Sequence, residues 1–431
     1  MDILNSTNSH HVLFLQGPLG PFFKEMAALF SRRGYISHRI TFNGGDHFYA
    51  GGDHVVAYRG TPEDWPVFIA DYLQAHAIAA VFVMGDCRYY HRTTRPVCEQ
   101  QGVRFMVFEE GYLRPNTITL EEHGVNALSQ LDLSRENLSR IEAHTCKSAV
   151  AMGGTMGARS RFAFFYYGAF GLARSWYDHY QHHRASNPII EPAKWLRGFG
   201  RKLLYKYRDA KLERNLQQAL SQQFYMVPLQ VHDDSQMIYH SPYRSVEAFI
   251  EVVIRSFARR APEDTVLVLK HHPMDRGYTH YGKIIQQLGK KLGISERLIY
   301  CHDLHLPSIY HHCRGMVTVN STVGTSALLH EVPVKVMGRA MYDLPGLTSQ
   351  CPLDTFWKNP DAVNSDLFLQ LQTLLFDQTQ INGSFFTRLD LTCNNVLAFY
   401  QQHFDQRHIQ TSHAKIFAIP ELKCNQIEAA V

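Results

Sequence analysis

Residues 79–85 read AAVFVMG, residues 103–111 read VRFMVFEEG, and an amphipathic helix is expected between them near 92–101. Short runs rich in Val and Phe that are joined by single helices predict parallel strands with crossover connections. The same pattern extends back to the beginning of the printed chain. It predicts further strands at HVLFLQ (11–16) and ISHRITF (36–42), and further helices over 22–33 and 64–75. These residues together predict one α/β unit built on a parallel sheet.

A second series of strands and helices is expected after residue 222. Apolar runs at 225–231, 266–273, 297–302, 315–320 and 333–338 alternate with helices expected near 246–260, 281–293, 307–313 and 322–331. The fold class predicted is α/β and GT-B-like, with two Rossmann-like domains whose parallel sheets face a central cleft. Ligands of open α/β sheets bind beyond the carboxyl ends of the strands, so the motifs at those ends are the candidate site.

The expected division of the chain has four parts. They are an N-terminal Rossmann-like unit (1–150), an aromatic and basic linker or membrane-facing insertion (151–221), a C-terminal Rossmann-like unit (222–352), and a helical segment with a tail (353–431).

Composition bounds the kinds of partner. Of the 431 residues, 45% are hydrophobic and 19% charged, which is typical of a globular protein, and the net charge of +4 favours anionic substrates or a membrane surface over nucleic acid. The eight cysteines include no C-x-x-C pair, which argues against a disulfide scaffold or zinc ribbon and favours a reducing compartment. The first residues lack a basic n-region, and no apolar stretch approaches the roughly 20 residues that span a bilayer. A cytoplasmic protein with peripheral membrane contact is expected.

The linker region has two interpretations. Residues 161–183 are crowded with aromatics, and residues 194–214 carry eight Lys and Arg. This combination suits a segment that lies at a membrane interface, with rings at the headgroup level and cations against anionic lipid. It equally suits an inter-domain helical hairpin whose aromatics pack inward and whose charges are solvated.

Two glycine-containing motifs follow the first two strands. In QGPLGPFF (16–23), Gln16 and Gly17 lie where a strand should end and a helix begin, a place where backbone N–H groups can approach an anion. In FNGGD (42–46), Asn43 and Asp46 flank two glycines that a tight turn alone would also explain. All four residues are candidates for substrate binding.

Two adjacent acids end the last predicted strand of the first unit. Glu109 and Glu110 are followed by Arg114. Neighbouring carboxylates raise each other's proton affinity, so one of them is a candidate general base or nucleophile. The alternative is that one simply pairs with Arg114, which is itself a candidate for substrate binding.

The second unit opens with a cluster of polar residues after its first strand. The candidates for sugar binding there are Gln230, Asp233, Ser235, Gln236, His240 and Ser241. Asp234 is a candidate reacting carboxylate, since a carboxylate can act as nucleophile in a retaining displacement. A turn capped by the aspartates is the alternative.

The motif LKHHPMDRGY (269–278) follows a buried strand. Its candidates for gripping a phosphate or carboxylate are Lys270, His271, His272, Pro273 and Arg276. A metal site is not expected, because adjacent histidines tend to point to opposite faces.

The motif NSTVGTSALLHE (320–331) places a strand end directly before a helix. Its candidates for phosphate binding are Asn320, Ser321, Thr322, Gly324 and Ser326, since a helix N-terminus presents free N–H groups and hydroxyls. Glu331 is a candidate acceptor of hydrogen bonds from a ribose. The same residues would cap a helix without any ligand.

In these motifs the chain resembles the KpsS/LipB family of capsule polysaccharide proteins. The resemblance runs from about Val12 to Trp357 and is carried, in order, by QGPxGPFF, FNGGD, EEGYLRPxxITLExxGVN, LQVxxDSQ, HSPY, KHHPMDRG, NSTVGTSAL, LPGL and LDTFW.

The resemblance implies a retaining β-Kdo glycosyltransferase with CMP-Kdo as donor substrate and no cofactor or metal. Such an enzyme adds the first Kdo of the poly-Kdo linker to lyso-phosphatidylglycerol, on the inner face of the cytoplasmic membrane, before a second Kdo transferase extends it. Residues 1–150 would then serve the acceptor and residues 222–352 the CMP-sugar. By motif, His272 and Pro273 would belong to the CMP-binding signature, Ser321, Thr322 and Ser326 to the phosphate site, and Glu110, Asp234 and Glu109 to the reacting carboxylates.

Two other functions stay open from the residues. The chain could be a non-catalytic component of a capsule assembly and export complex, or a transferase of another CMP-activated acidic sugar such as sialic acid.

Overall fold

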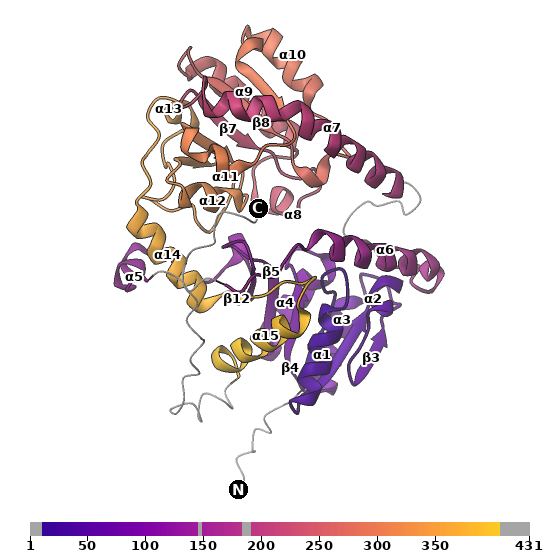
Figure 1. Ribbon diagram of the computed structural model, residues 1–431. Helices are drawn as coiled ribbons and strands as arrows, with labels where there is room; N and C mark the ends of the chain where they lie inside the picture. The colour runs from indigo at the N-terminus through magenta and orange to yellow at the C-terminus, as the bar shows by residue number, and fades with distance from the viewer. Residues whose placement is uncertain (1–10, 145–148, 183–190, 406–431) are drawn as a thin grey trace. The chain divides into compact units, whose positions relative to one another are not determined.

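The chain folds into two compact units in the computed structural model, which describes residues 11–144, 149–182 and 191–405. Of the described residues, unit 1 comprises 11–131, 149–182 and 374–405, and unit 2 comprises 132–144 and 191–373 (Figure 1). Among the helices described, none combines the length and the apolarity needed to cross a membrane.

Unit 1 is built on a seven-stranded sheet in the order β12-β6-β5-β4-β1-β2-β3. Its strands are β1 (His11–Phe14), β2 (Ile36–Thr41), β3 (His54–Ala57), β4 (Ile78–Met84), β5 (Arg104–Glu110), β6 (Thr117–Glu122) and β12 (Gln380–Asn382). The first five are parallel, whereas β6 runs antiparallel to both β5 and β12.

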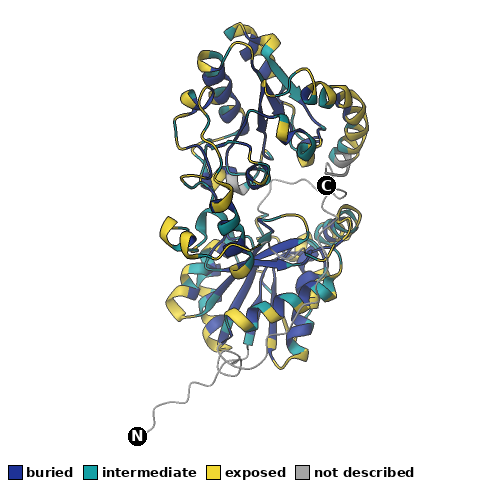
Figure 2. Cartoon of the chain, turned by 60° about the vertical axis from the view of Figure 1, so that its left-hand side comes forward, coloured by how far each residue is buried: buried dark blue, intermediate teal, exposed yellow. Residues whose placement is uncertain are grey.

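Helices of unit 1 pack around this sheet. They are α1 (Phe22–Arg32), α2 (Gly44–Phe48), α3 (Trp65–Ala75), α4 (Tyr89–Gln101), α6 (Met156–Leu172) and α15 (Leu389–His403). Helices α1 and α15 contact each other over a core in which Phe14, Phe82 and Phe108 have no exposed surface. The strands β1, β2, β4 and β5 of this sheet are accordingly mostly dark blue in Figure 2, whereas the edge strand β3 is exposed or partly buried.

Unit 2 is built on a five-stranded sheet, all parallel, in the order β11-β10-β7-β8-β9. Its strands are β7 (Phe224–Pro228), β8 (Val266–Lys270), β9 (Leu298–Cys301), β10 (Gly315–Thr318) and β11 (Val334–Val336). Its helices are α5 (Arg135–Arg140), α7 (Glu191–Gln217), α8 (Ser235–His240), α9 (Val246–Arg260), α10 (Gly282–Leu292), α11 (Leu306–Ile309), α12 (Val323–Leu329), α13 (Leu353–Phe356) and the first part of α14 (Ser365–Gln378).

The α/β class with two Rossmann-like units built on parallel strands, which is the GT-B-like class, is confirmed. Strands and helices lie close to their expected positions because parallel strands that are buried on both faces form continuous apolar runs, whereas buried side chains repeat about every 3.6 residues in a helix. The central cleft stays a prediction.

The expected boundaries are wrong at the C-terminal side. Residues 353–373 belong to unit 2, whereas β12 and α15 belong to unit 1. The physical reason is strand pairing: β12 adds an edge strand to the sheet of unit 1, with Ile381 opposite Ile118. The tail expected at the end of the chain lies outside the described residues.

The aromatic and basic linker also divides differently from the expectation. Helix α6 belongs to unit 1 and α7 to unit 2, so the segment expected as one linker is divided between the two units. In α6, Ala163 and Tyr166 are buried while Phe164 is 75% exposed. Aromatics of this segment therefore both pack and face solvent.

The glycines of FNGGD serve a close helix approach. A Cβ on Gly44 would lie 2.2 Å from the backbone oxygen of Ala169, and one on Gly45 would lie 2.7 Å from the ring of Tyr166. Both contacts join α2 to α6. These two glycines are thus required by packing, and neither has the positive φ that a special turn would need.

Replacing Gly44 with Ala is expected to destabilise unit 1 by about 1–3 kcal/mol, because the added methyl group forces α6 away from α2. Thermal unfolding followed by circular dichroism measures the change. Gly168→Ala is the matched control on α6 itself: no atom lies within 4 Å of its added Cβ, so it should leave stability unchanged or raise it by up to about 1 kcal/mol. Equal melting temperatures for the two variants would contradict the packing role of Gly44.

Candidate functional site

The carboxyl edge of β5 in unit 1 carries the two predicted acids. Glu109 and Glu110 are both partly buried, and Glu109 accepts a hydrogen bond from the backbone N–H of Glu110 at 3.0 Å. Burial, together with the nearby charges of Glu110 and Asp86, raises the pKa of Glu109 to about 7. A carboxyl group with such a pKa can accept a proton at neutral pH, as a general base must.

Arg114 does not neutralise these acids directly. Within the described residues it forms no ion pair with either glutamate, and its Nε instead donates to the carbonyl of Gly111 at 3.1 Å. Its charge only partly opposes the rise in the pKa of Glu109. The alternative interpretation, in which one acid simply pairs with Arg114, is therefore wrong for this structure.

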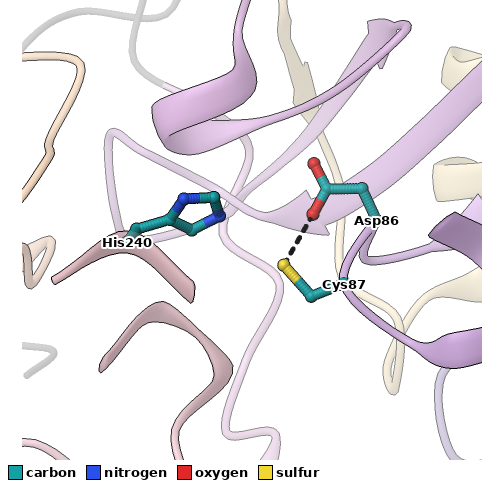
Figure 3. A group of neighbouring side chains, drawn as sticks. All are labelled: Asp86, Cys87 and His240. Atoms are coloured by element: carbon teal, nitrogen blue, oxygen red, sulfur yellow. Dashed lines mark hydrogen bonds between the residues drawn. The ribbon is translucent and has the colours of Figure 1, made fainter. Parts of the chain in front are cut away.

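Asp86 is an acid of this edge that the sequence analysis did not single out. It follows β4, the parallel neighbour of β5, and is 3% exposed. Its carboxylate accepts a hydrogen bond from the backbone N–H of Val125 at 3.0 Å. It also accepts one from the thiol of Cys87 at 3.1 Å (Figure 3). The sequence contained a signal for Asp86, since GDC (85–87) directly follows the AAVFVM run and so places an acid at the carboxyl end of a predicted strand. His240, also drawn in Figure 3, belongs to unit 2 and is described with it.

A second acid with a near-neutral pKa lies on β6. Burial raises the pKa of Glu121 to about 7. Its carboxylate accepts hydrogen bonds from the hydroxyls of Tyr112, at 2.5 Å, and Ser129. Because both its oxygens are engaged, Glu121 holds the loop after β5 in place, whereas Glu109 accepts a single backbone bond. Antiparallel pairing with β5, which the sequence pattern did not reveal, brings it here.

Gln16, Asn43 and Asp46 form one buried network in unit 1. Asp46 accepts hydrogen bonds from Gln16 Nε2 (3.0 Å), Asn43 Nδ2 (2.9 Å) and the hydroxyl of Tyr166 (3.0 Å). All three predicted residues are at most 3% exposed, so the network joins the two motifs to α6. Gly17 contacts the ring of Phe23, which a Cβ would approach to 2.8 Å. Substrate contact by these four residues stays a prediction.

In unit 2, hydrogen bonds join the loops that follow three neighbouring strands. Gln230, after β7, donates from its Nε2 to Asn320 Oδ1, after β10, at 3.0 Å. On the other side, His232 Nδ1 lies 2.6 Å from Asp275 Oδ1, after β8. Because β7 lies between β8 and β10, three motifs distant in sequence meet at one carboxyl edge.

The acids and histidine of the β7 loop occupy different positions. Asp234 accepts a hydrogen bond from Gln230 Nε2 at 3.1 Å and immediately precedes α8. Asp233 is partly buried beside it, and His240, at the end of α8, is 5% exposed. Ser241 bonds to the backbone of Met237 and Tyr243. The side chains of Ser235 and Gln236 lie outside the described part of the structure.

The histidine-rich loop presents one face outward. His272 and Pro273 are partly or fully exposed, whereas Lys270 and His271 are buried. Burial lowers the pKa of Lys270, and it lowers that of His271 to about 4. The opposite orientations of the adjacent histidines are those expected from the sequence.

Arg276 is engaged within the protein. It is 5% exposed, and its Nη2 donates to Asp303 at 2.6 Å and to the carbonyl of His302 at 2.8 Å. In this loop His272 is a predicted donor that is partly exposed, and its Nδ1 accepts the backbone N–H of Met274 at 3.2 Å. The expected grip by four donors is wrong for Arg276, because the internal carboxylate of Asp303 binds its guanidinium.

The loop after β10 leads into α12 as predicted. Ser321 and Thr322 are partly exposed, and Ser321 Oγ accepts the backbone N–H of Val323 at 3.2 Å. Gly324 lies against Tyr342, whose hydroxyl a Cβ would approach to 2.3 Å. Ser326 is partly exposed one turn further along α12.

Glu331 does not belong to this edge. It follows the end of α12 and lies just before β11 begins, so it is at the amino ends of the parallel strands. Its carboxylate accepts a hydrogen bond from the hydroxyl of Ser365 at 2.6 Å. The ribose role predicted for Glu331 is therefore wrong, because a crossover helix carries the chain to the opposite edge of the sheet.

Comparisons with known proteins agree with these motifs. A family model described as "Capsule polysaccharide biosynthesis protein" matches residues 79–386. The capsule polysaccharide export protein KpsS of Escherichia coli is 38% identical over 374 residues, which cover 87% of this chain and 96% of that protein. The capsule polysaccharide modification protein LipB of Neisseria meningitidis serogroup A is 37% identical over 389 residues, covering 89% and 93%.

Solved structures with similar folds are much more distant in sequence. The beta Kdo 2,7 transferase KpsC of Thermosulfurimonas dismutans matches 83% of this chain and 88% of its own, with 15% identity and a TM-score of 0.39. A glycosyltransferase of Rickettsia africae matches 92% and 98%, with 10% identity and a TM-score of 0.37.

Proposed function

The chain belongs to the capsule polysaccharide biosynthesis family, and from that premise we propose that it is a retaining β-Kdo glycosyltransferase. It transfers Kdo from CMP-Kdo to lyso-phosphatidylglycerol at the inner face of the cytoplasmic membrane and so initiates the poly-Kdo linker of a capsule. A second Kdo transferase is its proposed partner.

The observation that carries the proposal is the meeting of three motif loops at one edge of unit 2. The Gln230–Asn320 and His232–Asp275 contacts fix these loops relative to one another. They hold the partly exposed His272 and the hydroxyls of the partly exposed Ser321 and Thr322 at the carboxyl edge of the same sheet. Such donors suit the single phosphate of CMP, whose departure they stabilise as negative charge develops on it.

In the proposed reaction, the bond between the anomeric carbon of Kdo and the phosphate oxygen breaks, and CMP leaves with the electron pair. A carboxylate first bonds to this carbon from the face opposite CMP. The acceptor hydroxyl then bonds to the same carbon, the carboxylate leaves with the electron pair of its bond, and the hydroxyl proton passes to a second carboxylate. Glu109 suits this base role because its pKa is about 7. Glu110 and Asp234 are the other reacting carboxylates of the proposal, since retention of configuration commonly uses two displacements.

The test uses purified protein, freshly made CMP-Kdo and fluorescent lyso-phosphatidylglycerol in the presence of a chelator of divalent metals. A product that carries one Kdo is expected. The absence of any product would overturn the proposal, whereas a product formed only after metal is restored would overturn its metal-independent form. Competition by CMP-sialic acid separates the Kdo transferase from a transferase of another CMP-activated acidic sugar.

A second candidate function comes from the name of the E. coli relative, which is an export protein. In that case the chain would be a non-catalytic component of capsule assembly and export. Ala at Glu110 or Asp234 discriminates the two functions: a scaffold keeps its role in capsule assembly, whereas a transferase loses turnover by orders of magnitude.

A further inference from the structure

One face of helix α7 is fixed against unit 2. Tyr205 and Asp209 are 6% and 3% exposed. The ring of Tyr205 stacks on His302 with 3.8 Å between centroids, and the Asp209 carboxylate accepts the backbone N–H groups of His302 (2.7 Å) and Asp303 (3.0 Å). Leu216, with no exposed surface, continues this face at the i, i+4, i+11 spacing. The orientation of α7 about its axis is thereby set.

The opposite face of α7 is apolar and exposed. Leu196, Phe199, Leu203 and Tyr207 are 76%, 65%, 72% and 89% exposed. Their i, i+3, i+7, i+11 spacing places them in one row along the helix. A contiguous row of large apolar side chains on a surface is a feature of interaction sites, whereas scattered single ones are ordinary. We call this row the α7 stripe.

Cations border the α7 stripe. Each residue of an α-helix is rotated by about 100° from the one before it. This rotation places the exposed side chains of Lys202 and Lys206 on one side of the stripe and those of Lys211 and Arg197 on the other. Other cations of the helix point inward: Lys194 lies over the ring of Tyr278, and Arg201 donates to the carbonyl of Arg276 at 2.7 Å. The outward cations thus surround the apolar row.

We infer that the α7 stripe and its bordering cations form a surface that binds an anionic lipid bilayer. A helix that lies in a membrane interface places apolar side chains among the acyl chains and cations beside the headgroups, which is the arrangement seen here. A second copy of this chain is a poorer occupant, because a two-fold contact through this face would bring the same cations against one another. This surface deepens the proposed lipid-directed function, yet it can be tested without any sugar donor.

The test is co-sedimentation of the full chain with vesicles of phosphatidylglycerol and phosphatidylcholine, compared with vesicles of phosphatidylcholine alone. Binding to the anionic vesicles is expected, and it should weaken as salt is raised. Lys202→Glu, Lys206→Glu and Lys211→Glu together should lower the partition coefficient about 100-fold, since each removed cation contributes about fivefold at such a surface. Phe199→Ser with Leu203→Ser should lower it at least about 10-fold.

Matched controls come from exposed residues of the same kinds elsewhere. Lys283→Glu, Lys290→Glu and Lys291→Glu on α10 repeat the charge change in the same unit, and Val67→Ser with Leu329→Ser removes two exposed apolar side chains. These controls should bind vesicles like the unmodified protein. Equal binding by α7 variants and controls overturns the inference. The inference is also overturned if the α7 variants, and not the controls, change their oligomeric state in light scattering while they still bind lipid normally.

The vesicle-binding experiment tests the α7 surface independently of the proposed enzyme activity. If the enzyme proposal alone is wrong, vesicle binding still depends on the α7 stripe. If the surface alone is wrong, the α7 variants bind vesicles normally while sugar transfer to lyso-phosphatidylglycerol is still observed.

Discussion

Replacing Glu109 with Gln is expected to lower kcat for sugar transfer by about 10²–10⁴-fold, the usual contribution of a general base. Burial raises the pKa of Glu109 to about 7, so the carboxylate that accepts the proton accumulates as pH rises from about 6 to 8. The unmodified protein should therefore gain activity over this range. The Gln variant should lose that rise as well as the rate, which a pH profile of kcat measures.

Stability distinguishes lost chemistry from damaged folding. Because the pKa of Glu109 is higher in the folded chain than in the unfolded chain, the folded state loses stability as pH rises through that pKa. Gln cannot ionise and removes this loss. At pH 8 the Glu109→Gln variant should thus melt at or above the temperature of the unmodified protein while transferring sugar far more slowly.

Two further variants test whether Glu109 is the general base. Glu99→Gln replaces an exposed glutamate of the same unit and should keep full activity. Glu110→Gln tests the neighbouring carboxylate. A Glu109→Gln variant with unchanged kcat and pH profile would contradict the base role, and a loss confined to Glu110→Gln would move that role to Glu110.

Replacing Asp275 with Ala is expected to cost unit 2 about 3–5 kcal/mol of unfolding free energy. Asp275 has no exposed surface, and its carboxylate contacts His232 (2.6 Å), Thr279 (2.5 Å) and the hydroxyl of the buried Tyr281 (3.3 Å). Removing it leaves these groups without their shared acceptor. Denaturant unfolding measures the change.

The same substitution separates two loops of the proposed CMP site, so CMP should bind more weakly to the folded Asp275→Ala protein. Calorimetric titration with CMP at low temperature checks this. Asp264→Ala, which changes an exposed aspartate of unit 2, is the control and should alter neither property. An Asp275→Ala variant within about 0.5 kcal/mol of the unmodified protein would contradict the role of this carboxylate, since surface changes have effects of that size.

The predicted site was partly recoverable from the sequence. Gln230, His272 and Ser321 were expected at carboxyl ends of strands, and parallel strands bring such ends to one edge. Arg276 and Glu331 were also singled out by type and nearby position. Arg276 is bound by the carboxylate of Asp303 within the protein. Glu331 follows α12 and so lies at the amino ends of the strands, away from the predicted site.

The sequence by itself determined the class of fold and the placing of most motifs. Runs such as AAVFVM and VLVLK are short and almost wholly apolar, as buried strands are. The strand conformation of such a run can therefore be predicted from its own few residues. Only the tertiary structure decided that β12 pairs with β6, with Ile381 opposite Ile118, and that Gly44 serves a helix contact.

The same holds for the outward face of α7 and the near-neutral pKa of Glu109. Contacts between segments far apart in the chain depend on complementary surfaces, and burial depends on everything packed around a residue. No spacing along the chain records either of them.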